Sequence, residues 1–334
     1  MKIGNYDIDK PLFLAPMDDV TDYPFRNICK EWGADVVVTE FISAEAVIRN
    51  VDRSFKKMHF NEEERPIGIQ LYGSAELSMA SASQKVESFA PDFIDINAGC
   101  WVKKIVNRGD GAGLLKDLRK LERVLSEVKM STKLPVTLKT RLGWDEKNIT
   151  IYDVIDISHK IGIDFITVHL RTRQQGLKGN ADWTWIPKIK EKSNIPIVAN
   201  GDIKTPQDVK QCFDLGADGI MIGRAVIGNP FLFKRCKMFL EKGDYVPEPD
   251  IKERIHWCLI HFKKHLEYYG EQRGVPIFRK FYNGYLHGYP YIGKIRTEIM
   301  NLRCAKKIEE ILTSIMENPE RVSEIILSDV DVIE

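Results

Sequence analysis

The sequence predicts an α/β protein in which a (β/α)8 TIM barrel precedes a C-terminal all-helical domain. Short apolar runs rich in β-branched residues recur along the first part of the chain, and helix-length segments separate them. Near-continuous apolar strands that alternate with helices indicate a parallel sheet covered on both faces. Eight such units in about 230 residues come close to the roughly 250 that such a barrel needs. A doubly wound open sheet is the alternative, which the even spacing of the units disfavours.

The strands are expected where the apolar runs lie, and the helices in the segments between them. In chain order the predicted strands are 12–15, 36–39, 67–71, 92–96, 135–139, 164–169, 195–199 and 218–222, and the predicted helices include 75–89, 114–129, 151–161 and 205–215. Two prolines and a glycine in 243–250 indicate a linker. Residues 251–334 show helical periodicity and no strand run. We therefore predict a barrel domain over 1–242 and a helical domain over 243–334.

Composition narrows the class of protein. The chain has 334 residues, of which 43% are hydrophobic and 29% charged, as in ordinary soluble globular proteins. Its 49 basic and 48 acidic residues leave a net charge of +1, so overall charge does not indicate a nucleic-acid binder. The apolar runs are far shorter than a membrane span, and the N-terminus has no apolar signal-peptide core. We expect a cytoplasmic protein without a membrane segment.

Polar or reactive residues follow almost every predicted strand. In a barrel of this kind the C-terminal ends of the strands converge on one rim, where active sites lie. Any one of these residues has a structural explanation, but so many on one rim indicate a ligand. They are Glu40, Gln70, Asn97, Cys100, Lys139, Arg141, His169, Arg171, Asn200, Asp202 and Arg224.

The loops after the last two strands indicate a phosphate site. They carry Asn200-Gly201-Asp202 and Gly223-Arg224, and these two loops often bind phosphate in such barrels. Glycine lets the backbone approach an anion closely, and arginine adds a bidentate charge. The alternative is that both glycines only serve turns. The GDGAG segment (109–113) lacks the spacing of a dinucleotide-binding loop and does not directly follow a strand.

Two further residues point to redox chemistry without identifying it. Lys139 could balance negative charge on a reduced flavin, and Gln70 could bond the pyrimidine end of that ring. Cys100 lies in the longest interval between strands, on a glycine-bearing loop followed by Lys103 and Lys104. It is a candidate nucleophile or proton donor. The six cysteines form no CxxC pair, so we expect reduced thiols and no metal.

Taken together, the motifs resemble the tRNA-dihydrouridine synthase family, particularly its bacterial B-type branch. They run in order along nearly the whole chain: LAPMDDVTDYPFR (14–26), GIQLYG (68–73), DINAGC (95–100), GDGAG (109–113), LKTRLGW (138–144), ITVHLRTRQQG (166–176), VANGDI (198–203), GADGIMIGRAVIGNP (216–230) and YYGEQRG (268–274). The resemblance implies an FMN-binding catalytic barrel over 1–242 and a tRNA-binding helical domain over 243–334. It also implies that NADPH reduces FMN, which then reduces the C5–C6 double bond of selected uridines.

The resemblance implies a role for each matching residue. Cys100 would be the general acid. The FMN contacts would be Pro16, Met17, Asp18, Gln70, Lys139, His169, Asn200, Gly201, Asp202, Gly223 and Arg224. The tRNA contacts would be Asn97, Arg141, Arg171, Arg173, Arg279 and Lys280. The resemblance implies no metal, and we expect a monomer.

Two positions depart from the family pattern. Trp101 follows Cys100 where proline is usual, which frees the loop backbone and adds a large ring near the uracil pocket. Phe281 stands where histidine is more frequent, and we expect it to alter an RNA contact.

The near-neutral total conceals a split in charge. Residues 252–307 hold twelve Lys and Arg against four acids, whereas 308–334 hold one Arg against eight acids. Aromatic residues lie among the basic ones, a combination that suits a folded RNA. The alternative is a solvated basic face over an aromatic core.

Two other functions stay open at this point. One is an FMN barrel oxidoreductase for a free pyrimidine or an enone, and the other is a catalytically impaired RNA-binding relative. The sequence does not decide tRNA against a ribosomal RNA loop, nor NADPH against NADH.

Overall fold

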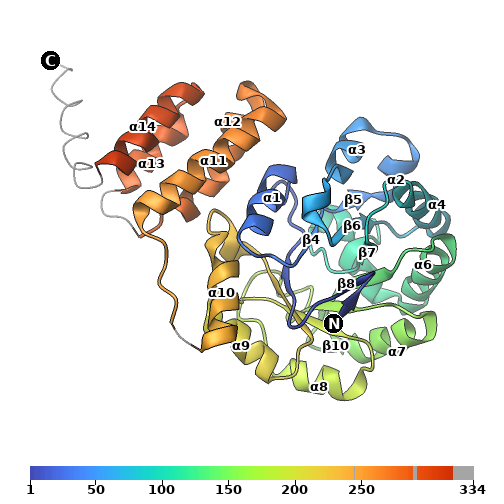
Figure 1. The fold of residues 1–334 in the computed structure, drawn as a ribbon. Coiled ribbons are helices and arrows are strands. Elements are labelled where there is room, and N and C mark those ends of the chain that lie inside the picture. The colour runs from blue at the N-terminus through green and yellow to red at the C-terminus, as the bar shows by residue number, and fades with distance from the viewer. Residues whose placement is uncertain (244, 289–291, 319–334) are drawn as a thin grey trace. The chain divides into compact units, whose positions relative to one another are not determined.

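The structure, a computed structural model, contains a closed barrel of eight parallel strands (Figure 1). It describes residues 1–243, 245–288 and 292–318. The barrel closes because β13 pairs with β3 and β4 pairs with β6, both in parallel register. The predicted (β/α)8 barrel is therefore confirmed. Its strands are β3 (Leu12–Leu14), β4 (Val36–Val38), β6 (Ile67–Tyr72), β7 (Phe93–Asn97), β8 (Val136–Arg141), β11 (Ile166–His169), β12 (Ile197–Asn200) and β13 (Gly219–Ile222).

Helices surround the strands, and local signals in the sequence begin and end them. Asp22 caps α1 by accepting from the Phe25 backbone N–H at 3.1 Å. Thr205 and Asp208 form a capping box at the start of α9, and Gly162 ends α7 with a left-handed φ of 80°. The helices of this part are α1 (Tyr23–Glu31), α2 (Ala44–Ile48), α3 (Asp52–Met58), α4 (Glu76–Glu87), α5 (Lys103–Val106), α6 (Leu118–Ser131), α7 (Ile151–Ile161), α8 (Trp185–Lys192) and α9 (Pro206–Asp214).

An apolar cluster fills the N-terminal end of the barrel. The hairpin of β1 (Lys2–Ile3) and β2 (Tyr6–Asp7) brings Ile3 into a buried cluster with Phe13, Phe93 and Phe165. The Phe165 ring centroid lies 5.6 Å from that of Phe13 and 5.4 Å from that of Phe93. Because apolar side chains fill this end, the polar groups of the interior gather at the other end, where the strands finish.

Two short pairings extend the barrel. The two-residue strand β5 (Ile42–Ser43) pairs with β6. After β8 the chain forms a second hairpin from β9 (Gly143–Asp145) and β10 (Asn148–Ile149). Trp144 lies in this hairpin, on β9.

The chain divides into two compact units, residues 1–225 and the residues from Val226 onward. The second unit contains α10 (Phe231–Lys242), α11 (Ile251–Tyr269), α12 (Glu271–Tyr285), α13 (Ile292–Asn301) and α14 (Ala305–Glu317). The division precedes α10, whereas the sequence places α10 with the barrel. A cause is the close packing around Gly284, where an added Cβ would lie 1.9 Å from the Ile227 carbonyl oxygen. The functions of the two parts stay predictions.

Several aromatic residues of the helical unit lie in its core. Phe262, Phe278, Phe281 and Tyr282 are fully buried. Phe281 therefore contributes to core packing, and the expectation that it alters an RNA contact stays a prediction. The acid-rich residues 319–334 lie outside the described residues. Among the helices that the structure describes, none combines the length and apolarity of a membrane span.

Candidate active site

A cavity of about 550 Å³ opens at the C-terminal ends of the barrel strands. Its lining comes from loops that are far apart in the sequence and that the parallel strands bring to one rim. Most of the residues predicted for the cofactor and two of those predicted for RNA line it: Pro16, Met17, Lys139, Arg141, His169, Arg171, Asn200, Gly201, Asp202, Gly223 and Arg224.

Asp202 organises the cationic side of the cavity. Its carboxylate accepts hydrogen bonds from Arg171, from Arg224 at 3.0 Å and from the Ala181 backbone N–H at 2.9 Å. Although burial opposes it, the hydrogen bond from Arg171 holds the pKa of Asp202 below its ordinary value. Asp202 thus stays ionised and fixes the positions of the two guanidinium groups.

The backbone before Asp202 is shaped to bring the chain close to a ligand. Gly201 has a φ of 123°, and an added Cβ would lie 2.9 Å from the Ala181 Cβ. Asp202 itself has a left-handed φ of 55°. Glycine at 201 is therefore required by both conformation and space.

Lys139 reaches from β8 to β12. Its ammonium donates to the Asn200 Oδ1 at 3.0 Å, and the Asn200 Nδ2 donates to the Met221 carbonyl at 2.8 Å. Burial, followed by repulsion from Arg141, lowers the pKa of Lys139 to about 8. The Lys139 side chain is therefore mostly protonated at neutral pH, and it loses its proton as the pH rises above about 8.

His169 and Arg171 present polar atoms without partners. The His169 Nδ1 and the Arg171 Nη1 are buried and have no hydrogen-bond partner among the residues that the structure describes. Burial, then the charge of Arg141, lowers the pKa of His169 well below its ordinary value, so its imidazole is neutral at neutral pH. Buried polar atoms are almost always paired in proteins, so these two suit a ligand that brings polar groups.

Arg141 braces two loops of the rim. Its Nε donates to the Gly99 carbonyl at 2.8 Å, and its Nη1 donates to the carbonyls of Thr172 at 3.0 Å and Gly176 at 3.1 Å. The sequence predicts a contact with RNA, but these bonds already occupy much of the buried guanidinium. Arg141 thus positions the cysteine loop against the loop that follows β11.

The cysteine loop is held by a chain of buried polar side chains. The Asn97 Oδ1 accepts from the backbone N–H groups of Gly99 at 3.0 Å and Cys100 at 2.9 Å. The Asn97 Nδ2 donates to the Gln70 Oε1 at 2.8 Å, and the Gln70 Nε2 donates to Asp95 at 2.6 Å. Asn97 and Gln70, predicted as substrate and flavin contacts, therefore position Cys100 in this structure.

The Cys100 thiol is partly buried beside charged groups. Burial is the largest influence and raises the pKa of the thiol, while the charges of Arg141 and Lys139 oppose it. The thiol therefore carries its proton at neutral pH, as a proton donor must. Cys100 itself does not line the cavity, but its neighbour Trp101 does.

Trp101 packs against the loop after β11. An added Cβ on Gly176 would lie 3.1 Å from the Trp101 ring, and Gly176 has a left-handed φ of 58°. The tryptophan side chain is 39% exposed and lines the cavity. It therefore limits the freedom that loss of the family's proline would give to this loop.

The remaining predicted residues lie elsewhere. Asp18 is outside the cavity lining and pairs with Lys57 at 2.6 Å. Arg173 lines a second cavity, described below. In the helical unit, the Arg279 Nη2 donates to the Leu302 carbonyl at 3.2 Å, and the Lys280 ammonium lies 5.7 Å from the Phe281 ring centroid. Their roles toward FMN and RNA stay predictions.

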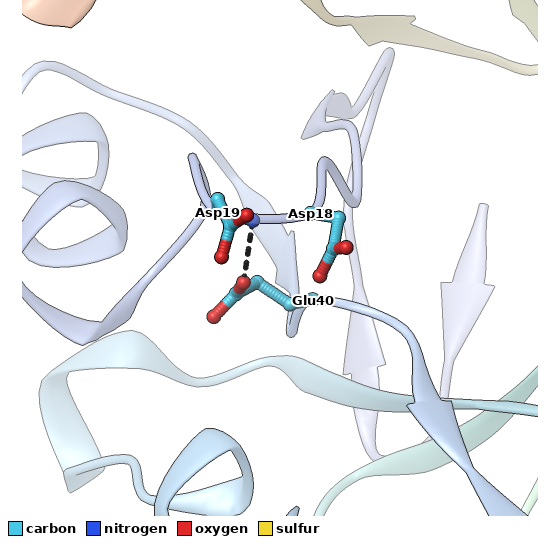
Figure 2. A group of neighbouring side chains, drawn as sticks. All are labelled: Asp18, Asp19 and Glu40. Carbon is cyan, nitrogen blue, oxygen red and sulfur yellow. Dashed lines mark hydrogen bonds between the residues drawn. The ribbon is translucent and has the colours of Figure 1, made fainter. Parts of the chain in front are cut away.

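Asp18, Asp19 and Glu40 form an acidic cluster, in which Figure 2 shows the carboxylates turned toward one another. The Asp19 backbone N–H donates to Glu40 at 2.6 Å. The Lys57 ammonium lies 2.6 Å from the Asp18 carboxylate and 3.0 Å from the Glu40 carboxylate. Lysine thus supplies the positive charge that a metal ion would bring, and the cluster is explained as an ion-pair network.

Sequence reasoning did not find two classes of lining residue. Lys204 adds a further cation to the cavity, two residues after Asp202. Its place in the loop after β12, close to other predicted cofactor contacts, is the signal in the sequence that indicates it. Leu177, Gly179 and Asn180 also line the cavity, and they carry no signal in the sequence because their long loop has no regular pattern.

Comparison with known proteins decides the family. The family model described as "Dihydrouridine synthase (Dus)" matches residues 13–319 of this chain. The match covers the barrel strands and the described helices of the second unit. The chain belongs to the dihydrouridine synthase family.

Relatives of this dihydrouridine synthase family member match it over most of both chains. It is 37% identical over 323 residues to the probable tRNA-dihydrouridine synthase of Rickettsia conorii, covering 95% of this chain and 98% of that protein. It is 36% identical to tRNA-dihydrouridine synthase B of Pasteurella multocida, covering 86% and 87% of the two chains. The corresponding protein of Pseudomonas aeruginosa is 34% identical, with 91% and 92% covered. The resemblance to the B-type branch is therefore confirmed.

A solved structure supports the fold. The histamine dehydrogenase of Rhizobium sp. 4-9 superposes with a TM-score of 0.56 at 14% identity, covering 79% of this chain and 50% of that one. At this identity the likeness concerns the fold alone. Membership of the dihydrouridine synthase family confirms the prediction of an oxidoreductase, because forming dihydrouridine from uridine is a reduction.

Proposed function

We propose that this dihydrouridine synthase reduces the C5–C6 double bond of selected uridines in tRNA, with FMN as resident cofactor and NADPH as its reductant. The observation that carries the proposal is the cavity at the C-terminal ends of the barrel strands. Several cations line it, and so does Trp101, the residue that follows Cys100. Family membership supports the reaction, and the names of the relatives support tRNA as the substrate.

The lining of the cavity fits FMN. Five cations line it, and Asp202 is the one acid among its described lining residues. The partnerless atoms of His169 and Arg171 supply further donors or acceptors for a polar ligand. A phosphate would be held at Gly201, Gly223 and Arg224, with the ring system near Met17 and Lys139.

The chain's own residues would complete the reduction. When bound, FMN supplies the hydride that adds to C6 of the uracil. The C5 atom then needs a proton, which the Cys100 thiol gives up to become a thiolate. Arg141 and Lys139 are close enough to act on the thiol's pKa, and they stabilise the negative charge that the thiolate carries.

The uridine base must reach the cavity, and the rest of the protein must hold the tRNA while it does so. A uridine must leave its stack to enter the cavity, at a cost of a few kcal/mol that is least in a loop. The basic residues of the helical unit would supply the contacts to tRNA phosphates. We infer that the enzyme acts as a monomer in the cytoplasm.

Two measurements test the proposed function. Cofactor released from the purified protein should co-elute with FMN in chromatography, and FAD or no flavin after reconstitution would contradict the cofactor. Incubation with NADPH and an unmodified tRNA transcript should add two hydrogens to particular uridines, detected by mass spectrometry of nuclease digests. Turnover of free uracil or of an enone with no change in tRNA would instead favour a small-molecule oxidoreductase.

A further inference from the structure

A second cavity, of about 600 Å³, lies within the barrel unit beside the candidate active site. Its volume is in the range of about 300–1,000 Å³ that small-ligand sites occupy. Four of its lining residues are cations: Lys103, Lys116, Lys120 and Arg173. None of them takes part in an ion pair within the part of the chain that the structure describes.

The acidic residue among those that line this cavity, Asp117, already accepts a hydrogen bond from the protein backbone. Asp117 is the N-cap of α6, and its carboxylate accepts from the Lys120 backbone N–H at 3.0 Å. The cavity therefore keeps a clear excess of positive charge. An excess of this kind, open to solvent, favours an anionic ligand.

Trp144 holds two of the cations in place. The Lys116 ammonium lies 4.0 Å from the centroid of its ring, and the Arg173 guanidinium carbon lies 4.5 Å from it. The Arg173 Nε is buried and has no hydrogen-bond partner in residues 1–243, 245–288 and 292–318. Cation–π contacts fix flexible side chains before a ligand arrives, so binding orders fewer groups.

Glycines of the GDGAG segment form part of the lining of this cavity and pack closely on their neighbours. Gly109 and Gly113 line it, and an added Cβ on Gly113 would lie 2.9 Å from the Val106 carbonyl oxygen. Gly111 packs on the cysteine loop, since its added Cβ would lie 3.0 Å from the Cys100 Cβ. The segment therefore connects the lining of the second cavity to the loop that carries the candidate acid.

The two cavities share both of their flanking loops. Trp101 and Arg171 line the first cavity, whereas Lys103 and Arg173, each two residues further on, line the second. Two residues span at most about 7 Å. A nucleotide next to a base held in the first cavity would therefore come within reach of the second.

We propose that the second cavity binds a nucleotide of the RNA substrate that flanks the reduced uridine, through its phosphate. This proposal rests on the proposed function. Lys103, Lys116 and Lys120 contact the phosphate, and Trp144 is a positioning residue for Lys116 and Arg173. Flanking nucleotides are splayed out when a base is extruded, and cationic grooves bind their backbone. The phosphates of NADPH offer similar chemistry, and the experiment separates the two.

The test compares Lys116→Ala/Lys120→Ala with Lys2→Ala/Lys133→Ala, a control that removes two exposed lysines from the opposite end of the barrel. Binding of an unmodified tRNA transcript is measured from about 0.05 to 0.3 M salt. The first variant should bind on the order of tenfold more weakly at 0.1 M salt. Its plot of log affinity against log salt should be shallower by about 0.7 for each phosphate that is no longer neutralised. The control should match the wild type.

A second pair of variants tests the positioning role. Trp144→Leu should weaken transcript binding and flatten the salt dependence, whereas Trp144→Phe should restore both, because a phenyl ring keeps a cation–π face. Flavin content reports folding of the barrel in each case. If Trp144→Phe binds as weakly as Trp144→Leu, the cation–π contacts do not position the cations and that role is overturned.

The outcomes show whether the proposed nucleotide subsite alone fails or the proposed function fails with it. Wild-type reduction of tRNA together with unchanged affinity in Lys116→Ala/Lys120→Ala overturns the subsite alone. A raised KM for NADPH in flavin reduction, with RNA binding unchanged, also overturns it and assigns the cavity to the nicotinamide nucleotide. A wild-type protein that neither binds nor reduces the transcript overturns the proposed function as well.

Discussion

At the scale of single residues, burial is the main cause of the pKa shifts of three groups at or beside the cavity. It raises the pKa of Cys100, lowers that of His169 and brings that of Lys139 to about 8. At neutral pH the site therefore combines a protonated thiol, a neutral imidazole and a lysine that is still mostly cationic. These three states suit a proton donor, a neutral hydrogen-bonding group and a counter-charge.

Replacing Cys100 should separate the two halves of the reaction. In Cys100→Ala, reduction of bound flavin by NADPH should proceed at the wild-type rate, because the thiol is needed only at the uracil. Reduction of tRNA should slow by about 10²–10⁴-fold, the usual contribution of general acid catalysis. Single-turnover measurements of each half-reaction check this, with Cys304→Ala as a control at an exposed cysteine. A wild-type rate on tRNA in Cys100→Ala would show that the cysteine is structural.

Lys139 should make flavin binding depend on pH. Its lowered pKa means that the free protein loses this positive charge above about pH 8. An anionic ligand favours the charged form, so binding should take up a proton and weaken as pH rises from 7 to 9. Quenching of FMN fluorescence by the cofactor-free protein measures this.

The matched variants for this pH dependence are Lys139→Met and Lys133→Met. Lys139→Met should bind FMN more weakly at pH 7 and show a flatter pH profile. Lys133→Met, which changes an exposed lysine at the other end of the barrel, should follow the wild type. A profile in Lys139→Met as steep as the wild type's would assign the titration to another group.

At the scale of elements, one arginine connects two loops that are far apart in the sequence. The three carbonyl oxygens that Arg141 binds belong to the cysteine loop and to the loop after β11. Lysine has the same charge but a single donor group, so it does not reproduce the planar fork. The brace is therefore specific to arginine.

Arg141→Lys should loosen both loops together. We expect amide hydrogen exchange to speed up in 99–103 and 171–179 while the barrel strands keep their protection. The free energy of unfolding should fall by about 2–3 kcal/mol, because buried carbonyls are deprived of charged hydrogen bonds. Exchange measured by mass spectrometry and urea titration check these outcomes. Faster exchange in only one of the two loops would contradict the shared brace.

The strands were predictable because each buried parallel strand is a nearly continuous apolar run. Every one of the eight predicted runs overlaps an observed strand. The hairpins β1–β2 and β9–β10 were not predicted, because strands of two or three residues are too short to form a pattern. The split before α10 also depends on close tertiary packing at Gly284, which periodicity does not encode.

The sequence predicted which residues lie at the cavity better than it predicted which groups their side chains contact. Parallel strands place their C-terminal ends on one rim, and this alone brings His169, Asn200 and Arg224 together. Side-chain direction does not follow from strand position. Gln70 turns toward Asp95 and Asn97, and Arg141 binds main-chain oxygens, which no pattern of side chains reveals.

At the scale of the whole molecule, the near-neutral total charge conceals one basic segment, residues 252–307, within the helical unit. Among its described cations, Arg279 is already bonded to the Leu302 carbonyl, whereas Arg303 and Lys307 are exposed. Exposed cations are the better candidates for direct phosphate contacts. Arg279 contributes more to holding α12 against the end of α13.

Arg303→Ala/Lys307→Ala should weaken tRNA binding without changing flavin content or flavin reduction. Each phosphate that is no longer neutralised should make the slope of log affinity against log salt shallower by about 0.7–0.9. Arg279→Ala/Lys280→Ala should also lower the melting temperature, because the Leu302 carbonyl loses its donor. Filter binding across salt concentrations and thermal melts separate the two effects. Equal slopes for the wild type and Arg303→Ala/Lys307→Ala would place the RNA contacts elsewhere.

The brace made by Arg141 has a consequence for how such an enzyme can diverge. Because the hydrogen bonds of this guanidinium within the described residues all go to main-chain oxygens, many side chains can stand in the two loops without weakening the brace. Trp101 and Leu177, which both line the cavity, can therefore be exchanged in evolution while the candidate acid keeps its place. Under the proposed function, the brace would keep the candidate acid in place while the residues that contact the nucleotide change.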